Sequence, residues 1–140
     1  MPDNPIADDV WRAMAAVVFD NRDAWRRVVI ETTGLPFSRV RVVRRLARRS
    51  MTAKEIAHAA SMDAPATSVA VSDLEDRGLV VRHADPTNRR CKVISLTDAG
   101  HQVVARIDGI DDPAPAPFAA LSASELETLH AILTKLAGSG

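Results

Sequence analysis

The sequence has a single cysteine, Cys91, no tyrosine, and only five aromatic residues among its 140. One cysteine excludes an internal disulfide and suits a reducing compartment, so we expect a cytoplasmic protein. No apolar run approaches the ~20 residues that a membrane-spanning helix needs, so we expect no membrane association. The acidic N-terminus, MPDNPIADDV, also lacks the basic and then apolar pattern of a secretion signal.

Residue patterns that support catalysis or metal binding are also missing. The four histidines are scattered, without an HExxH motif or a Cys/His pair at zinc spacing. Neither a Gly-rich phosphate loop nor a nucleophile paired with a base is evident. We therefore predict that the chain is not an enzyme and carries no metal or other cofactor. We interpret Cys91 as a small strand residue rather than a redox sensor.

The net charge is zero, but the charges are separated along the chain. Residues 22–92 hold 15 Lys and Arg against 8 Asp and Glu, whereas the two ends together hold 3 basic and 10 acidic residues. The most basic segment, residues 36–54, carries six arginines and Lys54 without any acid. Such an excess repels itself unless an anionic partner relieves it, which favours nucleic acid. A solvated helix face is the commoner outcome of a charge run and stays open as the alternative.

Apolar periodicity and helix-capping signals predict a chain that is mainly α-helical. Asp8 or Asp9 is expected to cap the first helix, and residues 20–21 interrupt its apolar stripe, which predicts either a bend or partial exposure there. Thr52 with Glu55, and Ser122 with Glu125, each form a capping box at the start of a helix. The predicted helices cover, in order, residues 8–32, 36–50, 52–60, 64–77, 98–107 and 122–136.

The predicted helix at residues 64–77 has two distinct faces. Asp63 caps it, and Gly78 ends it as a residue able to take φ > 0. The face with apolar helical spacing should point into the core and comprises Thr67, Ala70, Val71 and Leu74. The other face is small and uncharged and comprises Pro65, Ser68, Val69 and Ser72.

The stretch VVRHADPTNRRCKVISL predicts a β-hairpin with strands at about residues 79–83 and 91–96. Asp-Pro-Thr-Asn supplies the turn, and Arg89 and Arg90 follow directly after it. An arginine pair on a hairpin tip suits a narrow DNA minor groove, where the negative potential is strongest. We expect one arginine to contact DNA and the other to brace the loop, for example against Asp85, with Arg89 favoured as the contact.

A short helix, a tight turn, a capped second helix and a hairpin follow the order of a winged helix-turn-helix. The segment LARRSMTAKEIAHAASMDAPATSVAVSDLEDRGLVVRHADPTNRRCKVISLTDAG resembles the core of the MarR (multiple antibiotic resistance regulator) family of bacterial transcription factors. The resemblance spans about residues 35–104, and its most specific pieces are DLEDRGLVVR, DPTNRR and SLTDAG.

The resemblance implies a small β-hairpin wing and a winged helix-turn-helix with N- and C-terminal dimerisation helices. The implied divisions are residues 1–34 for the first dimerisation helix, 35–97 for the DNA-binding domain and 98–140 for the C-terminal dimerisation helices. It implies a homodimer on double-stranded DNA, with each recognition helix in a major groove and each wing in a minor groove. Many family members leave DNA when a small aromatic ligand binds between the dimerisation helices and the DNA-binding lobe.

We therefore expect a transcriptional repressor that binds a pseudo-palindromic operator. The DNA-contacting residues expected from the motifs are Lys54, Ala64, Pro65, Ala66, Ser68, Val69, Ser72, Arg89 and Arg90. The residues expected at an aromatic-ligand site are Trp11, Trp25, Phe37 and Arg41. Core packing or burial in a dimer is the alternative role for the three aromatic residues.

Two departures from the family pattern affect the expected function. Relatives commonly carry Arg, Ser and Thr on the recognition face, whereas only Ser68 and Ser72 can donate a hydrogen bond from it here. Relatives usually carry an acid where Asn88 stands, so an ion pair within the wing is lost. We expect modest base discrimination, with more weight on the wing and on DNA shape. The alternatives are a winged-helix module that docks a protein and a ligand-binding dimer with weak DNA binding.

Overall fold

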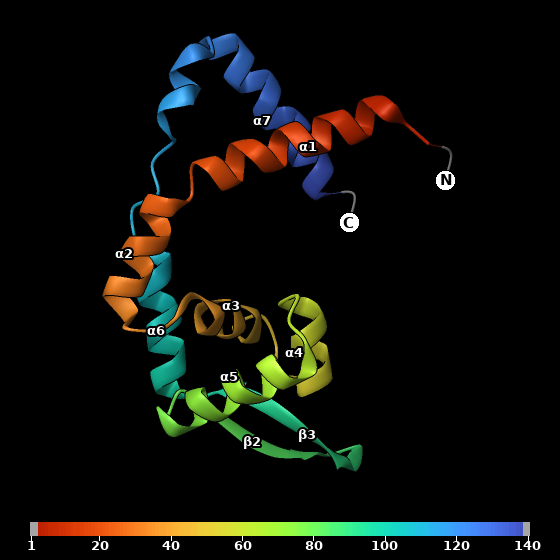
Figure 1. Cartoon of the computed structure of the whole chain (residues 1–140), viewed down its shortest axis with the longest axis vertical. Helices are drawn as coiled ribbons and strands as arrows, with labels where there is room; N and C mark the ends of the chain where they lie inside the picture. The colour runs from red at the N-terminus through yellow and green to blue at the C-terminus, as the bar shows by residue number, and fades with distance from the viewer. Residues whose placement is uncertain (1–2, 139–140) are drawn as a thin grey trace.

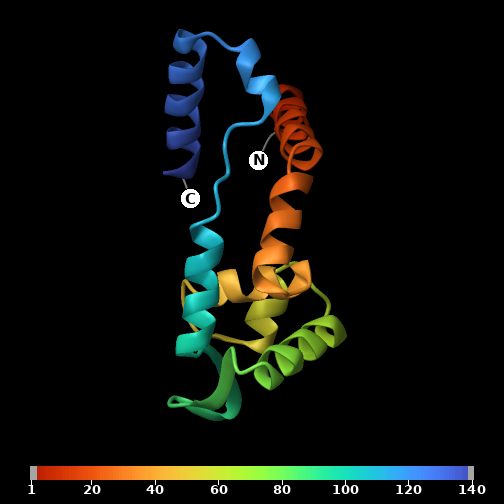
Figure 2. The same ribbon diagram turned by 90° about the vertical axis from the view of Figure 1, so that its left-hand side faces the viewer.

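The computed structural model describes residues 3–138 and shows a mainly helical chain with a small sheet. Helices α2 to α6 and the sheet form a lobe, and helices α1 and α7 stand away from it at the other end of the molecule (Figures 1 and 2). In chain order the elements are α1 (Pro5–Asp20), α2 (Asp23–Thr33), α3 (Phe37–Leu46), β1 (Met51–Thr52), α4 (Ala53–Ala59), α5 (Ala64–Asp76), β2 (Val80–Asp85), β3 (Asn88–Leu96), α6 (Asp98–Asp108), the 3₁₀ helix η1 (Ala116–Ala120) and α7 (Ala123–Ala137).

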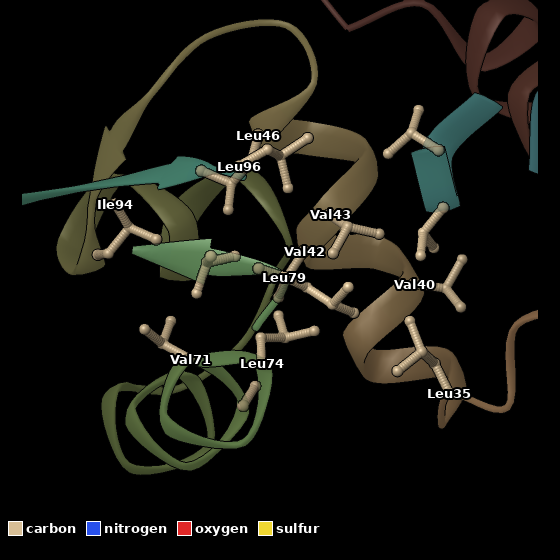
Figure 3. Packing of buried hydrophobic residues seen from close by; sticks show 14 of the residues in the cluster. Leu35, Val40, Val42, Val43, Leu46, Val71, Leu74, Leu79, Ile94 and Leu96 are labelled. Carbon is tan, nitrogen blue, oxygen red and sulfur yellow. The ribbon is translucent and has the colours of Figure 1, made fainter. Parts of the chain in front are cut away.

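The hydrophobic core lies inside the lobe. Side chains of α3 meet those of α5 and of the strands there (Figure 3), and burial of each such side chain contributes ~1.5–3 kcal/mol. By contrast, neither α1 nor α7 has a buried residue. Among residues 3–138 no helix is long and apolar enough to cross a membrane. The fully buried core side chains include Leu35, Val40, Val42, Val43, Ile56, Val71, Leu74, Val80 and Ile94.

The predicted first helix is wrong in two respects, because it is two helices and begins earlier. Asn4, rather than Asp8 or Asp9, caps α1 by accepting a hydrogen bond from the N–H of Ala7. Asn21 ends α1, since its side-chain amide donates to the carbonyl of Val17 at 2.8 Å. An asparagine that bonds the preceding turn in this way competes with helix continuation.

The predicted second helix is too long at its C-terminal end, and one strand was not foreseen. Helix α3 ends at Leu46, and the chain then extends to form β1. Met51 and Thr52 of β1 pair with Ile94 and Val93 of β3. Because the partners lie some forty residues apart in the sequence, no local pattern indicates this two-residue strand.

The antiparallel sheet has the strand order β1-β3-β2. Both hairpin strands are longer than predicted, so the turn narrows to Pro86 and Thr87. Helix α6 approaches the start of β2 so closely that a Cβ on Gly100 would overlap the carbonyl oxygen of Leu79. The winged helix-turn-helix fold expected from the sequence is confirmed.

Candidate nucleic-acid interface

Helix α5 and the hairpin lie at the end of the lobe farthest from α1 and α7 (Figures 1 and 2). The predicted division of α5 into a buried and an exposed face is confirmed. Its buried residues are Thr67, Ala70, Val71 and Leu74. Pro65, Ser68, Val69 and Ser72 are exposed. The exposed face of α5, made of these four residues with Ala64 and Ala66, is therefore open to a partner.

The start of α5 is defined by local hydrogen bonds. The Asp63 carboxylate accepts a hydrogen bond from the N–H of Ala66 at 2.7 Å, as predicted for an N-cap. The hydroxyl of Thr67 donates to the Asp63 carbonyl at 2.8 Å and satisfies the one buried polar side chain of the helix. These bonds fix the first turn of α5, from which the small residues project.

The two serines of this face differ in their surroundings. The hydroxyl of Ser72 accepts a hydrogen bond from Arg82 of β2 at 3.2 Å, and Arg82 also pairs with Glu75 at 3.4 Å. Ser68 forms no side-chain hydrogen bond within the described chain. Ser68 is therefore the unengaged hydroxyl on the exposed face of α5, while Ser72 links that face to the wing.

An acid at the far end of α5 holds two arginines, and sequence reasoning missed this cluster. Asp73 accepts hydrogen bonds from Arg39 of α3 at 3.0 Å and from Arg77 at 3.1 Å. The Arg39 bond, followed by the Arg77 bond, holds the pKa of the Asp73 carboxyl below its usual range. The Arg39–Asp73 pair joins segments 34 residues apart, so only the folded chain reveals it.

The tip of the wing is organised by Asp85. Its carboxylate accepts hydrogen bonds from the Thr87 N–H at 2.9 Å and the Thr87 hydroxyl at 2.8 Å. The Thr87 N–H, followed by the hydroxyl, lowers the pKa of the Asp85 carboxyl. Asp85 is thus engaged within the turn rather than with an arginine.

Both wing arginines are exposed and unpaired. The side chains of Arg89 and Arg90 form no hydrogen bond or ion pair with any residue in the range 3–138. The prediction that one of them braces the loop is therefore wrong, and the Asp85 carboxylate accepts its hydrogen bonds from Thr87 instead. Two guanidinium groups are available to an anion at the tip of the hairpin.

The remaining predicted contact, Lys54, lies in the first turn of α4. It is exposed and borders a shallow groove between α4 and the start of α5. The neighbouring Arg49 is neutralised by Glu55, whose carboxylate accepts its hydrogen bond at 2.8 Å. The Thr52 N–H, followed by Arg49, lowers the pKa of Glu55. Lys54 has no such acidic partner in the described residues.

The structure brings three of the four predicted ligand-site residues together. The rings of Trp25 and Phe37 meet edge to face with centroids 5.9 Å apart. The guanidinium carbons of Arg22 and Arg44 lie over the Trp25 ring, 3.9 and 5.2 Å from its centroid. Trp11 lies apart on α1, with 67% of its surface exposed.

Arg41 lies beside a cavity of about 360 Å³, here named the arginine cavity. The Arg41 guanidinium donates to the carbonyl of Ala60 at the end of α4. The arginine cavity is lined by Phe37, Val40, Arg41, Arg44, Arg45, Ala47, Arg48, Val104 and Asp108.

The comparisons with known proteins agree with this architecture. A family model described as MarR family matches residues 33–90. A protein of Thauera aromatica, proposed to regulate transcription of the hcr operon, is 37% identical over 81 residues, which are 56% of this chain. The chain spans about half the length of that curated relative, 49%.

Solved structures show the same fold over nearly the whole chain. The apo form of wild-type MarR from E. coli is 18% identical, with a TM-score of 0.73 and coverage of 96% of this chain and 98% of that one. A MepR mutant from S. aureus is 23% identical, with a TM-score of 0.70 and coverage of 91% and 95%. A MepR mutant bound to an oligodeoxyribonucleotide is 24% identical, with a TM-score of 0.58 and coverage of 95% and 96%.

Proposed function

The chain has a winged helix-turn-helix fold and its residues 33–90 match the MarR family model, and from this premise we propose that it is a transcriptional repressor that binds double-stranded DNA as a homodimer. One observation carries the proposal. The exposed, unpaired guanidinium groups of Arg89 and Arg90 lie on the wing, at the same end of the lobe as the exposed face of α5. A helix and a hairpin so placed suit a major groove and the adjacent minor groove.

The exposed face of α5 supports only modest reading of base sequence. Ser68 and Ser72 can donate single hydrogen bonds, while Ala66 and Val69 offer methyl groups to a thymine methyl. No side chain of this face can form the two parallel hydrogen bonds that identify a purine. Specificity therefore rests largely on the wing arginines and on groove width, which varies with sequence.

Lys54 is proposed to position the lobe on the phosphate backbone. Its ammonium group is exposed at the start of α4, beside the first turn of α5. Each phosphate that such a group neutralises releases condensed counterions, which strengthens binding without reading sequence.

The homodimer is proposed to form through α1 and α7. These helices have no buried residue, although they carry large apolar side chains such as Trp11, Phe19 and Leu136, exposed by 67, 67 and 56%. An apolar groove of about 490 Å³ lies between them. Two lobes related by a twofold axis would contact half-sites about one helical turn, ~10 bp, apart.

A small aromatic ligand is proposed to release the DNA by binding beside Trp25, Phe37 and Arg41. Phe37 and Arg41 line the arginine cavity together, and Trp25 contacts Phe37. A guanidinium next to an aromatic edge suits a ring with an acidic substituent. A thermal-shift screen with phenolic acids would test this part of the proposal.

The decisive experiment is selection of bound DNA from a random pool at ~150 mM salt, followed by affinity measurements over a range of salt concentrations. A palindromic consensus whose affinity falls steeply with salt is expected. Val69, which is 61% exposed, favours a second candidate, a module that docks a protein through an apolar face. Recovery of no enriched DNA would favour that candidate.

A further inference from the structure

The basic residues around the arginine cavity are not neutralised by acidic residues within residues 3–138 of the same chain. The arginine cavity carries the exposed Arg44, Arg45 and Arg48, and the side chains of Arg45 and Arg48 form no hydrogen bond or ion pair in the described part of the chain. The acid that lines the same cavity, Asp108, forms no ion pair there either. The cavity therefore keeps an excess of positive charge.

The matching excess of acid lies at the start of α1. Residues 3–9 carry Asp3, Asp8 and Asp9, and among the residues that the structure describes only Asp9 of these acids has an ion-pair partner, the exposed Arg12 at 3.2 Å. Helix α1 has 16 residues and is about 24 Å long. It holds residues 3–9 away from the lobe of its own chain (Figure 1).

We infer that residues 3–9 of one copy pack against the arginine cavity of a second copy, so that each cavity is completed by the partner's acidic segment. The inference rests on the proposed homodimer through α1 and α7. Charge complementarity identifies the occupant, since residues 3–9 carry three acids and the cavity four arginines against one acid. A twofold axis makes the contact twice.

The apolar side chains of α1 support the same arrangement. Ile6 and Val10, exposed by 75 and 51%, lie on the same helical turns as Asp8 and Asp9. A second copy that covers the groove between α1 and α7 would bury such side chains. Apolar burial would supply most of the affinity, while the ion pairs would fix how the two copies are oriented.

The test uses two full-length variants with opposite charge reversals, mixed and analysed by native mass spectrometry. One chain carries Asp8→Lys and Asp9→Lys, and the other carries Arg45→Glu and Arg48→Glu. Each homodimer then has like charges at both contacts, whereas the mixed dimer has opposite charges at both. With equal amounts of the two chains, we expect the ratio of mixed dimers to the two homodimers together to exceed its statistical value by about tenfold, and this excess to shrink at high ionic strength.

A matched control separates this contact from a general effect of net charge. A chain with Asp76→Lys and Asp98→Lys has the same charge change on exposed lobe residues, and it should mix statistically with the Arg45→Glu, Arg48→Glu chain. Statistical mixing of the first pair as well would overturn the inference while leaving the homodimer in place. A wild-type chain that is monomeric would overturn the proposed homodimer and this inference together.

Discussion

The guanidinium of Arg39 on α3 donates a hydrogen bond of 3.0 Å to the carboxylate of Asp73 on α5. This bond ties α5 to α3, and it satisfies an arginine that would otherwise face the same surface as Ser68 and Val69. Asp73 thus limits the positive charge beside the exposed face of α5.

The Asp73 carboxyl should make stability depend on pH in the acid range. The pKa of this carboxyl is lower in the folded chain than its ordinary value of 3.8. The ionised carboxylate therefore stabilises the folded state fully above pH 3.8, and this stabilisation is lost as the pH falls through the lowered pKa. We expect the urea midpoint of the wild type to fall more steeply from about pH 5 to about pH 2 than that of Asp73→Asn. Asp76→Asn is the matched control, and a parallel course for wild type and Asp73→Asn would contradict the prediction.

Arg89→Ala should weaken DNA binding at least about tenfold, ~1.4 kcal/mol, because a guanidinium inserted in the minor groove is lost. Arg90→Ala should have a comparable effect, since neither arginine is held within the wing. Fluorescence anisotropy with the selected DNA at fixed salt measures both. As a control, Arg106→Ala removes the same charge from the exposed side of α6 and should change the DNA affinity little. Unchanged affinity in the wing variants would show that the wing does not contribute to DNA binding.

Ser68→Ala should alter sequence preference more than Lys54→Ala does. The hydroxyl of Ser68 is the unengaged donor on the exposed face of α5, whereas the exposed Lys54 is proposed to contact phosphate. Repeating the DNA selection with each variant compares them directly. Lys54→Ala should lower affinity for all sequences alike, and it should reduce by about one the steepness with which the logarithm of the affinity falls with the logarithm of the salt concentration. Equal and uniform losses from both variants would refute this division of roles.

Gly100→Ala should destabilise the fold by about 1–3 kcal/mol, because its Cβ would overlap the backbone carbonyl oxygen of Leu79, which cannot rotate away. Gly109→Ala is the matched control in the same region, since a Cβ there meets its nearest atom at an ordinary 3.5 Å. Urea unfolding of both variants measures the difference. Equal midpoints would show that α6 can shift away from β2 at little cost.

Features that depend on nearby residues could be predicted from the sequence. The capping box of Thr52 and Glu55 forms as expected, with hydrogen bonds of 3.1 and 3.2 Å. Gly78 ends α5 with φ +76°, a conformation that costs a glycine little. The buried and exposed faces of α5 also follow from helical periodicity alone.

Features that depend on which of several hydrogen bonds a side chain forms, or on residues distant in the sequence, could not be predicted in this way. Asn21 interrupts the first helix because its side chain bonds the backbone of Val17, and asparagine elsewhere in a helix need not do so. The brace expected from Asp85 does not form, and its carboxylate instead accepts two hydrogen bonds from Thr87, two residues away. The Arg39–Asp73 pair requires knowledge of how α3 and α5 cross.

Because neither α1 nor α7 has a buried residue, pairing of two chains through these helices would make the amount of dimer depend on how much chain is synthesised. If the DNA-binding form needs two chains, its amount at low abundance grows with the square of the amount of chain synthesised. A twofold rise in synthesis then yields roughly a fourfold rise in paired molecules. A promoter under such control would respond to expression level more steeply than in proportion.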